Sequence, residues 1–261
     1  MQRIVWAAVV IVLGGGLAAY YFMRDEAPPA PLPPPPQQTI PRSPAPPAVV
    51  APAIRHPLRG VGATALPELE ASDAPMWQAL GDLLGRKGLT FIIGDGLIHR
   101  IVATVDNLPR DRMPVGVMPL KRVPKAFVTT GKGDALAIGA RNSARYALYA
   151  RLVGLIDAAQ LVAIYVRFYP LFQRAYEDLG FPNAYFNDRL VQAIDDLLAA
   201  PELSGPIRLI QPMVLYEFAD PKLEARSAGQ KIMIRIGREH AVTVKSKLRE
   251  VRRLVASDAA G

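Results

Sequence analysis

The stretch FPNAYFNDRL, residues 181–190, marks the joint between two predicted helices and sets the course of the chain on either side. The preceding Gly180 suits the left-handed backbone conformation that ends a helix, and Phe181 suits the apolar contact just after such an end. Pro182 prevents the first helix from continuing, because proline lacks the backbone donor. The stretch therefore predicts a helix that ends at Gly180.

The second half of the same stretch predicts the start of the next helix. Asn187 can cap its N-terminus, and Asp188 lies favourably in the positive first turn. Phe186 can pack against Val191 as a hydrophobic staple. Helix-joint chemistry thus accounts for every residue type, although three aromatic and four polar side chains in ten positions also fit a ligand site. Both interpretations stay open at this point.

Helical periodicity continues on both sides of the joint. The predicted helices cover residues 72–85, 97–108, 158–179, 188–200, 227–237 and 238–256. One more helix is predicted before residue 158, with Asn142 or Ser143 as its N-cap. Asp73 and Asp157 are candidate N-caps, Ser227 with Gln230 makes a capping-box pair, and Pro170 predicts a kink. Apolar stripes comprise Leu97, Ile98, Ile101, Val102 and Val105 in the second helix and Val242, Leu248, Val251 and Leu254 in the last.

Two segments have the composition of strands. AFVTTGKGDALAIGA, residues 126–140, predicts a small hairpin that turns around residues 131–134. IRLIQPMVLYEF, residues 207–218, is expected to be extended and broken at Pro212. We therefore expect a mainly α globular domain over residues 66–257, helical with a minor β-hairpin.

Residues 4–23, IVWAAVVIVLGGGLAAYYFM, contain no charged side chain. At ~1.5 Å per residue they make ~30 Å of helix, which is enough to cross the hydrocarbon core of a bilayer. We expect a single transmembrane helix within a membrane anchor at residues 1–26. A cleaved signal peptide is the alternative, although Gly16, Leu17 and Ala18 only approximate its cleavage site. The short leader with Arg3 favours a cytoplasmic N-terminus and hence a periplasmic C-terminal domain.

Residues 27–65 are expected to be a disordered, proline-rich linker. About half of the 25 prolines fall between residues 27 and 57, where helices and sheet ladders lose their donors. A polyproline II segment of this length reaches on the order of 100 Å. The simple interpretation is a stiff spacer, and a docking site for a proline-binding module is the alternative.

The overall composition excludes several classes of chemistry. The chain has 261 residues, of which 51% are hydrophobic, so it can bury a core. It has no cysteine, which excludes disulfides, thiolate nucleophiles and thiolate-ligated metals. The net charge of +8 favours, weakly, anionic partners such as lipid headgroups, acidic glycans or nucleic acid.

No motif in the sequence predicts a catalytic, cofactor-binding or metal-binding residue. The phosphate-binding loop, the H-E-x-x-H motif, the EF-hand loop and G-x-S-x-G are absent. The three histidines, His56, His99 and His240, have no partner at metal-ligand spacing. The acidic pairs Asp195–Asp196 and Glu177–Asp178 would allow sugar hydrolysis only with a partner elsewhere, and a solvated helix face is the simpler interpretation.

Aromatic and basic side chains recur together and form the candidate binding surface. The candidate residues are Tyr146, Tyr149, Tyr165, Arg167, Tyr169, Arg174, Tyr176, Tyr185, Asn187, Asp188 and Arg189. Such platforms bind sugar rings, peptides or bases. The alternative is that the tyrosines line a helix–helix core with their hydroxyls at its edge. The basic run Lys245, Lys247, Arg249, Arg252 and Arg253 is either a contact for anionic lipid or glycan or a solvated face.

Three long motifs resemble a known family. VATVDNLPR (102–110), YPLFQRAYEDLGFPNAYFNDRL (169–190) and YEFADPKLEARSAGQKIMIRIG (216–237) are similar to bacterial proteins of the family of unknown function DUF3014. The resemblance covers residues 66–255, in addition to the anchor and the linker. It implies a membrane-anchored bacterial protein without an assigned activity, and it supplies no catalytic residue.

Three functional hypotheses follow. The first is a binding or scaffold module of the bacterial envelope, anchored in the inner membrane and contacting an envelope protein or cell-wall glycan from the periplasm. The second is an envelope glycan hydrolase that uses acidic residues from separate helices. The third is a cytoplasm-facing domain that binds nucleic acid through the last helix, and this is the least favoured. No cofactor is expected.

Overall fold

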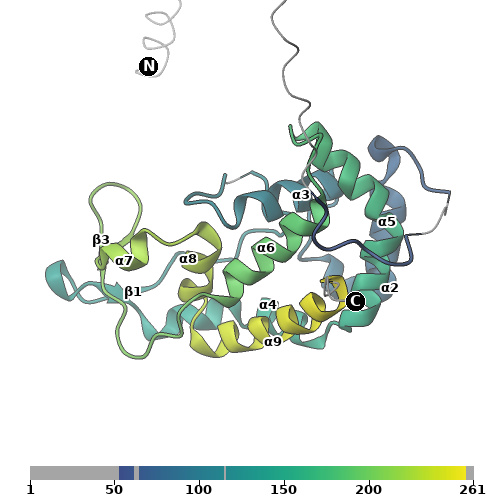
Figure 1. The fold of residues 1–261 in the computed structure, drawn as a ribbon. Helices are drawn as coiled ribbons and strands as arrows, with labels where there is room; N and C mark the ends of the chain where they lie inside the picture. Colours follow the sequence, from purple (N-terminus) through teal and green to yellow (C-terminus); the bar gives the residue numbers. More distant parts are fainter. Residues whose placement is uncertain (1–52, 62–64, 115, 257–261) are drawn as a thin grey trace, which may run out of the picture. The chain divides into compact units, whose positions relative to one another are not determined.

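The computed structural model describes residues 53–61, 65–114 and 116–256 (Figure 1). The predicted membrane anchor and the first part of the predicted linker lie outside the described residues. Within those three ranges, no single helix is long and apolar enough to cross a membrane.

The described chain is mainly helical, as predicted. The longer helices are α2 (Asp73–Leu89), α3 (Leu97–Asn107), α4 (Ala147–Leu155), α5 (Ala158–Asp178), α6 (Phe186–Leu198), α8 (Ala228–Arg235) and α9 (Arg238–Val255). The short ones are η1 (Leu69–Ala71), η2 (Gly133–Ala135), η3 (Ala140–Tyr146) and α7 (Pro221–Glu224). The two-residue strands are β1 (Thr129–Thr130), β2 (Ala137–Ile138), β3 (Leu209–Ile210) and β4 (Glu217–Phe218).

The β part consists of two antiparallel hairpins. The predicted hairpin is confirmed, with Thr129 opposite Ile138 in the β1–β2 pair. The segment expected to be extended around Pro212 forms the second hairpin, β3–β4. An antiparallel bridge between Ala137 and Arg208 joins the two pairs, so they form one small β end of the domain (Figure 1).

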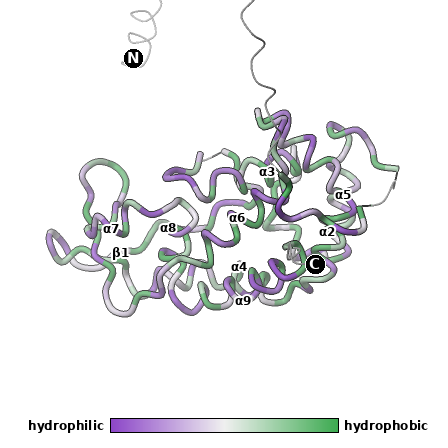
Figure 2. The backbone as a smooth tube through the Cα atoms, in the orientation of Figure 1, coloured by the Kyte–Doolittle hydropathy of each residue, from purple (hydrophilic) through white to green (hydrophobic). Residues whose placement is uncertain are grey.

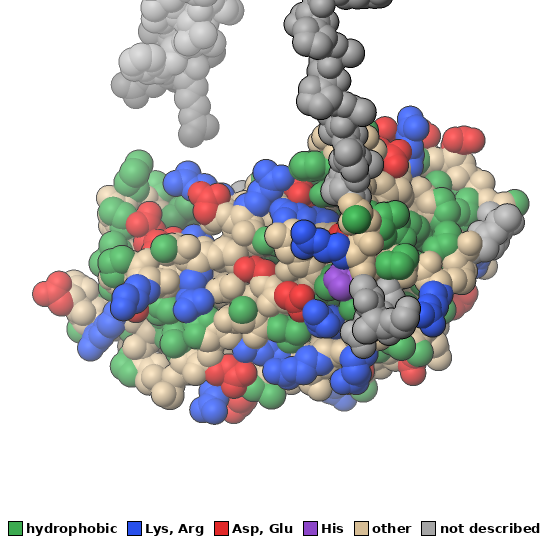
Figure 3. Space-filling model, in the orientation of Figure 1, with side chains coloured by type: hydrophobic (Ala, Val, Ile, Leu, Met, Phe, Trp, Pro, Cys, Tyr) green, Lys and Arg blue, Asp and Glu red, His purple; other side chains and the backbone are tan. Residues whose placement is uncertain are grey.

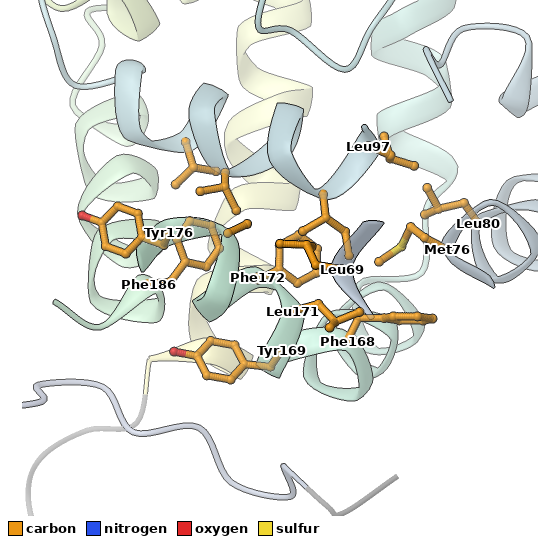
Figure 4. Packing of buried hydrophobic residues seen from close by; sticks show 14 of the residues in the cluster. Leu69, Met76, Leu80, Leu97, Phe168, Tyr169, Leu171, Phe172, Tyr176 and Phe186 are labelled. Atoms are coloured by element: carbon orange, nitrogen blue, oxygen red, sulfur yellow. The ribbon is translucent and has the colours of Figure 1, made fainter. Parts of the chain in front are cut away.

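Helix α5 supplies the largest share of the main core. It packs against α2, α3, α6 and α9 and continues through Pro170. Asp157 caps it as predicted, because its carboxylate accepts the backbone N–H of Gln160 at 2.8 Å. The face that carries Phe172 and Tyr176 is buried, and these rings meet Phe186 of α6 (Figure 4). Burial of these aromatic side chains is the main stabilising contribution here.

The joint between α5 and α6 is confirmed. Gly180 has φ 109°, and its backbone N–H donates to the carbonyl of Glu177. Phe181 donates its N–H to the carbonyl of Tyr176, and the two rings stack with centroids 4.7 Å apart. These contacts satisfy the carbonyls of Tyr176 and Glu177 in the last turn of α5, where the chain reverses.

Several predicted caps serve a different helix or none. Asp73 lies in the first turn of α2, but its carboxylate accepts the N–H groups of Gly96 and Leu97 and therefore caps α3. Gly85 interrupts α2 with φ 67° where an end was predicted, but the helix resumes to Leu89. Asn142 does not cap a helix. Its side chain is buried, where its Oδ1 accepts the N–H of Val128 and its Nδ2 donates to the Arg235 carbonyl.

The last helix uses the predicted stripe only in part, because Leu248 and Val251 pack against the core but the two ends of the stripe do not. α9 packs against α4, α5, α6 and α8, and Figure 2 shows hydrophobic and hydrophilic positions alternating along it. Val242 and Leu254 are nearly half exposed, whereas Ala241, Lys245 and Val255 are buried. The stripe was wrong at Val242 and Leu254, because the buried face passes through the adjacent positions Ala241 and Val255. Lys245 can lie on that face because its ammonium donates to the Ala200 carbonyl.

Candidate functional site

The start of α6 holds residues 53–58, here called the strap, through hydrogen bonds to the strap's backbone. The carboxylate of Asp188 accepts the N–H of Arg55 at 3.0 Å and the N–H of His56 at 2.8 Å. The hydroxyl oxygen of Tyr185 accepts the N–H of Leu58 at 3.2 Å. The strap belongs to the stretch predicted as linker, and it lies against the domain.

Asn187 ties the strap to two further segments. Its Nδ2 donates to the carbonyl oxygens of His56 and Val255, both at 2.8 Å, and its Oδ1 accepts the hydroxyl of Tyr165 at 3.1 Å. The side chain is fully buried, so these bonds form away from water. The predicted role of Asn187 as N-cap is therefore wrong: Tyr185 occupies the N-cap position, and Asn187 is the second residue of the helix.

The first backbone donor of α6 is satisfied by α5 instead. Gln173 accepts the N–H of Phe186 at 2.8 Å through Oε1, and its Nε2 donates to the Ala184 carbonyl at 2.9 Å. The hydroxyl of Tyr169 also donates to Gln173 Oε1 at 3.0 Å. Sequence reasoning missed Gln173, because a glutamine in a helix gives no signal of a partner thirteen residues away.

A buried carboxylate and two guanidinium groups lie beside the strap. Asp106 at the end of α3 accepts Nε of Arg189 at 3.1 Å and Nη2 of Arg110 at 2.6 Å. Arg189 also donates to the backbone carbonyl of Asp106 and, at 2.7 Å, to Gln192. One negative charge therefore faces two positive charges, and Arg110 is about half exposed. Together with Arg55, Asp188 and Asp195 beside them, these groups carry no net formal charge.

The strap, the end of α3 and the start of α6 enclose one groove. Its volume is about 640 Å³, within the usual range for ligand sites. It is lined by Ala53, Arg55, His56, Asp106, Arg110, Tyr176, Phe181, Ala184, Tyr185, Asp188, Arg189, Val191, Gln192 and Asp195. Acidic, basic and aromatic groups thus meet in one place, and we take this groove as the candidate site.

Three buried tyrosines near the groove, Tyr165, Tyr169 and Tyr176, stay protonated at neutral pH. Burial raises the pKa of Tyr176, the charge of Asp106 raises it further, and Arg189 and Arg110 oppose that rise. Burial also raises the pKa values of Tyr165 and Tyr169. These hydroxyls therefore act as hydrogen-bond donors or acceptors and not as phenolates.

Four predicted surface residues line the groove: Tyr176, Tyr185, Asp188 and Arg189. Three predicted residues are corrected, because Tyr169, Tyr176 and Asn187 are only 5%, 4% and 0% exposed. Their side chains face α6 and the strap, so the tyrosines line the core and do not form an open aromatic surface. Tyr165 also packs inside, with its ring 5.6 Å from that of Tyr169.

The other predicted surface residues are not brought to the groove. Tyr149 donates its hydroxyl to the Lys121 carbonyl at 3.0 Å, and Tyr146 packs on the α9 side of the domain. Arg167 lies over the ring of Phe168, and Arg174 pairs with Asp178 at 3.2 Å. Each of these contacts stabilises its own region.

The acidic pairs and the basic run are largely engaged. Arg252 pairs with Asp195 at 2.5 Å, and Asp196 accepts the hydroxyl of Ser227 at 2.6 Å. Lys247 pairs with Glu250, and Lys245 is buried as described above. Figure 3 shows basic side chains interspersed with acidic and apolar ones on the visible face. In the part of the chain that the structure describes, no group of three or more His, Cys, Asp or Glu residues is placed to hold a metal ion.

Comparison with known proteins gives one match. A family model described as protein of unknown function, DUF3014, matches residues 97–252. This range is more than half of the chain, so the chain belongs to that family and the resemblance of the three motifs is confirmed. No curated protein and no solved structure matches the chain significantly.

Proposed function

We propose that this member of the DUF3014 family is a binding or scaffold module of the bacterial envelope. In this proposal, residues 4–23 anchor it in the inner membrane and the domain faces the periplasm. The uncharged stretch and the proline-rich segment that follows support this arrangement. The groove beside the strap is the contact site.

The observation that carries the proposal is the set of hydrogen bonds that holds the strap against the start of α6. Asp188 and Tyr185 together accept three backbone N–H groups of the strap, at 2.8–3.2 Å. The end of the linker therefore has a defined position beside the groove. Because these residues are already ordered beside the groove, they lose less conformational entropy when a partner binds there.

The arginines of the groove, which its three aspartates balance in formal charge, offer guanidinium groups to a ligand that carries carboxylates. Arg110 and Arg189 share one carboxylate, and the exposed Arg55 lines the same groove. A guanidinium binds a carboxylate through two parallel hydrogen bonds. Within an envelope, acidic cell-wall glycan and acidic segments of envelope proteins both offer this group.

The same groove supports binding over hydrolysis. Its three carboxylates are engaged: Asp106 by two arginines, Asp188 by two backbone amides and Asp195 by Arg252. A glycosidase needs one carboxylic acid and one carboxylate directed at the substrate. Carboxylates that are already engaged in hydrogen bonds and ion pairs instead keep the groove-lining residues in position.

Site-specific crosslinking in intact cells tests the proposal. A photoreactive amino acid replaces the exposed Gln192 in the groove, and the matched control carries it at the exposed Thr130 of β1. We expect an adduct with one envelope protein or with glycan from position 192 only, weakened by Arg110→Gln. Equal adducts from both positions, or a C-terminal reporter active only in the cytoplasm, would contradict the proposal.

A further inference from the structure

We propose that a second cavity, which is partly open to solvent, binds a small uncharged hydrocarbon group of about six carbon atoms. The cavity has a volume of about 170 Å³ and lies among α2, α3, α5, α6 and α9. It is separate from the groove, and the inference does not rest on the proposed function.

The wall of the cavity is entirely apolar. Its lining side chains are aliphatic, methionine or aromatic, and nonpolar surface alone faces the space. Water in a protein interior needs two to four polar partners, so this site does not hold water well. An unfilled space of this size deprives the surrounding side chains of contacts, which destabilises the folded state. A hydrocarbon ligand restores those contacts.

Three aromatic rings define the shape of the space. The rings of Phe172 and Phe186 are nearly parallel, with 2° between their planes and 5.9 Å between their centroids. The ring of Tyr165 lies 5.3 Å from that of Phe172 at 58°. Rings in offset and tilted arrangements offer both faces and edges, which suits a compact ring or branched chain.

The cavity lies close to solvent and to the strap. Leu190 and Val251 in its wall are half-buried, so a ligand has a short way in. Tyr165 contributes its ring to the wall and donates its hydroxyl to Asn187, which fixes the strap. A bound ligand therefore contacts the residue that supports the attachment of the linker.

Two sources offer the same chemistry. A free small molecule with an aromatic ring presents about six carbons, and the end of a lipid acyl chain presents a similar volume. Benzene and 1-decanol serve as probes for the two sources. A response to both assigns the site to acyl chains, and a response to benzene alone assigns it to compact rings.

The test uses the full-length chain and its Val162→Phe variant under the same conditions. Val162 is buried in the cavity wall, and phenylalanine fills part of the space. At roughly ten times its dissociation constant, benzene should raise the melting temperature of the wild type by about 3–6 °C. The variant should show no such rise, because the binding volume is occupied.

Methyl NMR localises the binding. We expect benzene to shift the methyl signals of Leu190 and Val251 but not those of Leu209, which is buried in a different cluster. If Val162→Phe does not fold, Leu190→Phe serves as the filling variant. An unchanged melting temperature of the wild type, or equal shifts at Leu190 and Leu209, would overturn the proposal.

Discussion

The side-chain amide of Asn187 donates a 2.8 Å hydrogen bond to the backbone carbonyl of Val255, 68 residues further along the chain. The same Nδ2 group donates to His56, which lies in the strap before the first helix. One buried side chain thus joins the beginning and the end of the described domain. Two of the family-like motifs, around Asp106 and around Asn187, meet beside this point through Arg189.

Replacing Asn187 with alanine should lower the free energy of unfolding by about 2–4 kcal/mol. The change removes the hydrogen bonds that Asn187 makes to the carbonyls of His56 and Val255 and to the hydroxyl of Tyr165. Urea unfolding followed by circular dichroism measures the loss. Asn183→Ala, at an exposed position of the same joint, is the control and should change stability by less than about 0.5 kcal/mol. Equal losses of unfolding free energy in the two variants would contradict the role of Asn187 in joining the strap to the end of α9.

Asp188→Asn should release the strap while leaving the helical core folded. An amide oxygen can still accept one N–H, but the NH₂ group faces a donor where the carboxylate had accepted. Hydrogen exchange at Arg55, His56 and Leu58 should become faster by roughly tenfold or more, which corresponds to about 1.4 kcal/mol. Exchange in α5 should stay as in the wild type. Unchanged protection of the strap would mean that Asp188 does not hold it.

Asp106→Ala should destabilise the protein by about 3–5 kcal/mol. The carboxylate is buried and faces Arg110 and Arg189, so its loss leaves two guanidinium groups close together without a counter-charge. The matched control is Asp178→Ala, which breaks an exposed pair with Arg174 and should cost about 0–1 kcal/mol. Melting temperatures of the two variants provide the comparison, and a smaller loss for Asp106 than for Asp178 would contradict the assignment.

Glu224 should make stability depend on pH in the acid range. Burial alone would raise its pKa, but the N–H of Phe218 and the ammonium of Lys231 lower it by more. The folded pKa is therefore below the unfolded value, so this contribution is present above the unfolded pKa and disappears as pH falls through the folded pKa. Glu224→Gln should be less stable than the wild type at pH 7, and the gap should be smaller at pH 3. Urea titrations at both values check this, with exposed Glu70→Gln as the control. A gap of the same size at pH 3 would show that the charge of Glu224 is not responsible.

Much of the fold was predictable where neighbouring residues decide the structure. Gly180 takes a positive φ and Asp157 caps α5, and both depend only on the next few residues. The β1–β2 hairpin follows in the same way from the glycine-containing turn between its strands. Most errors came at caps and faces, as with Asp73, which faces the start of α3 and caps that helix.

The site was predictable in its residue types but not in its arrangement. Tyr185, Asp188 and Arg189 were selected because aromatic and polar side chains cluster there, and they do line the groove. Asp106, Arg110 and Gln173 were missed, because each looks like an ordinary surface residue until its partner is known. Tyr149 was selected by the same rule as Tyr185 and lies elsewhere.

The sequence by itself determined the helices, their joint, the small hairpin and the absence of cysteine chemistry, since these depend on composition or on contacts between close neighbours. Tertiary structure alone decided that Asn187 binds Val255, that Asp106 meets Arg189 and that the tyrosines of α5 face inward. The physical reason is that helical periodicity defines a face without saying what covers it. A partner tens of residues away is brought close only when the whole core packs.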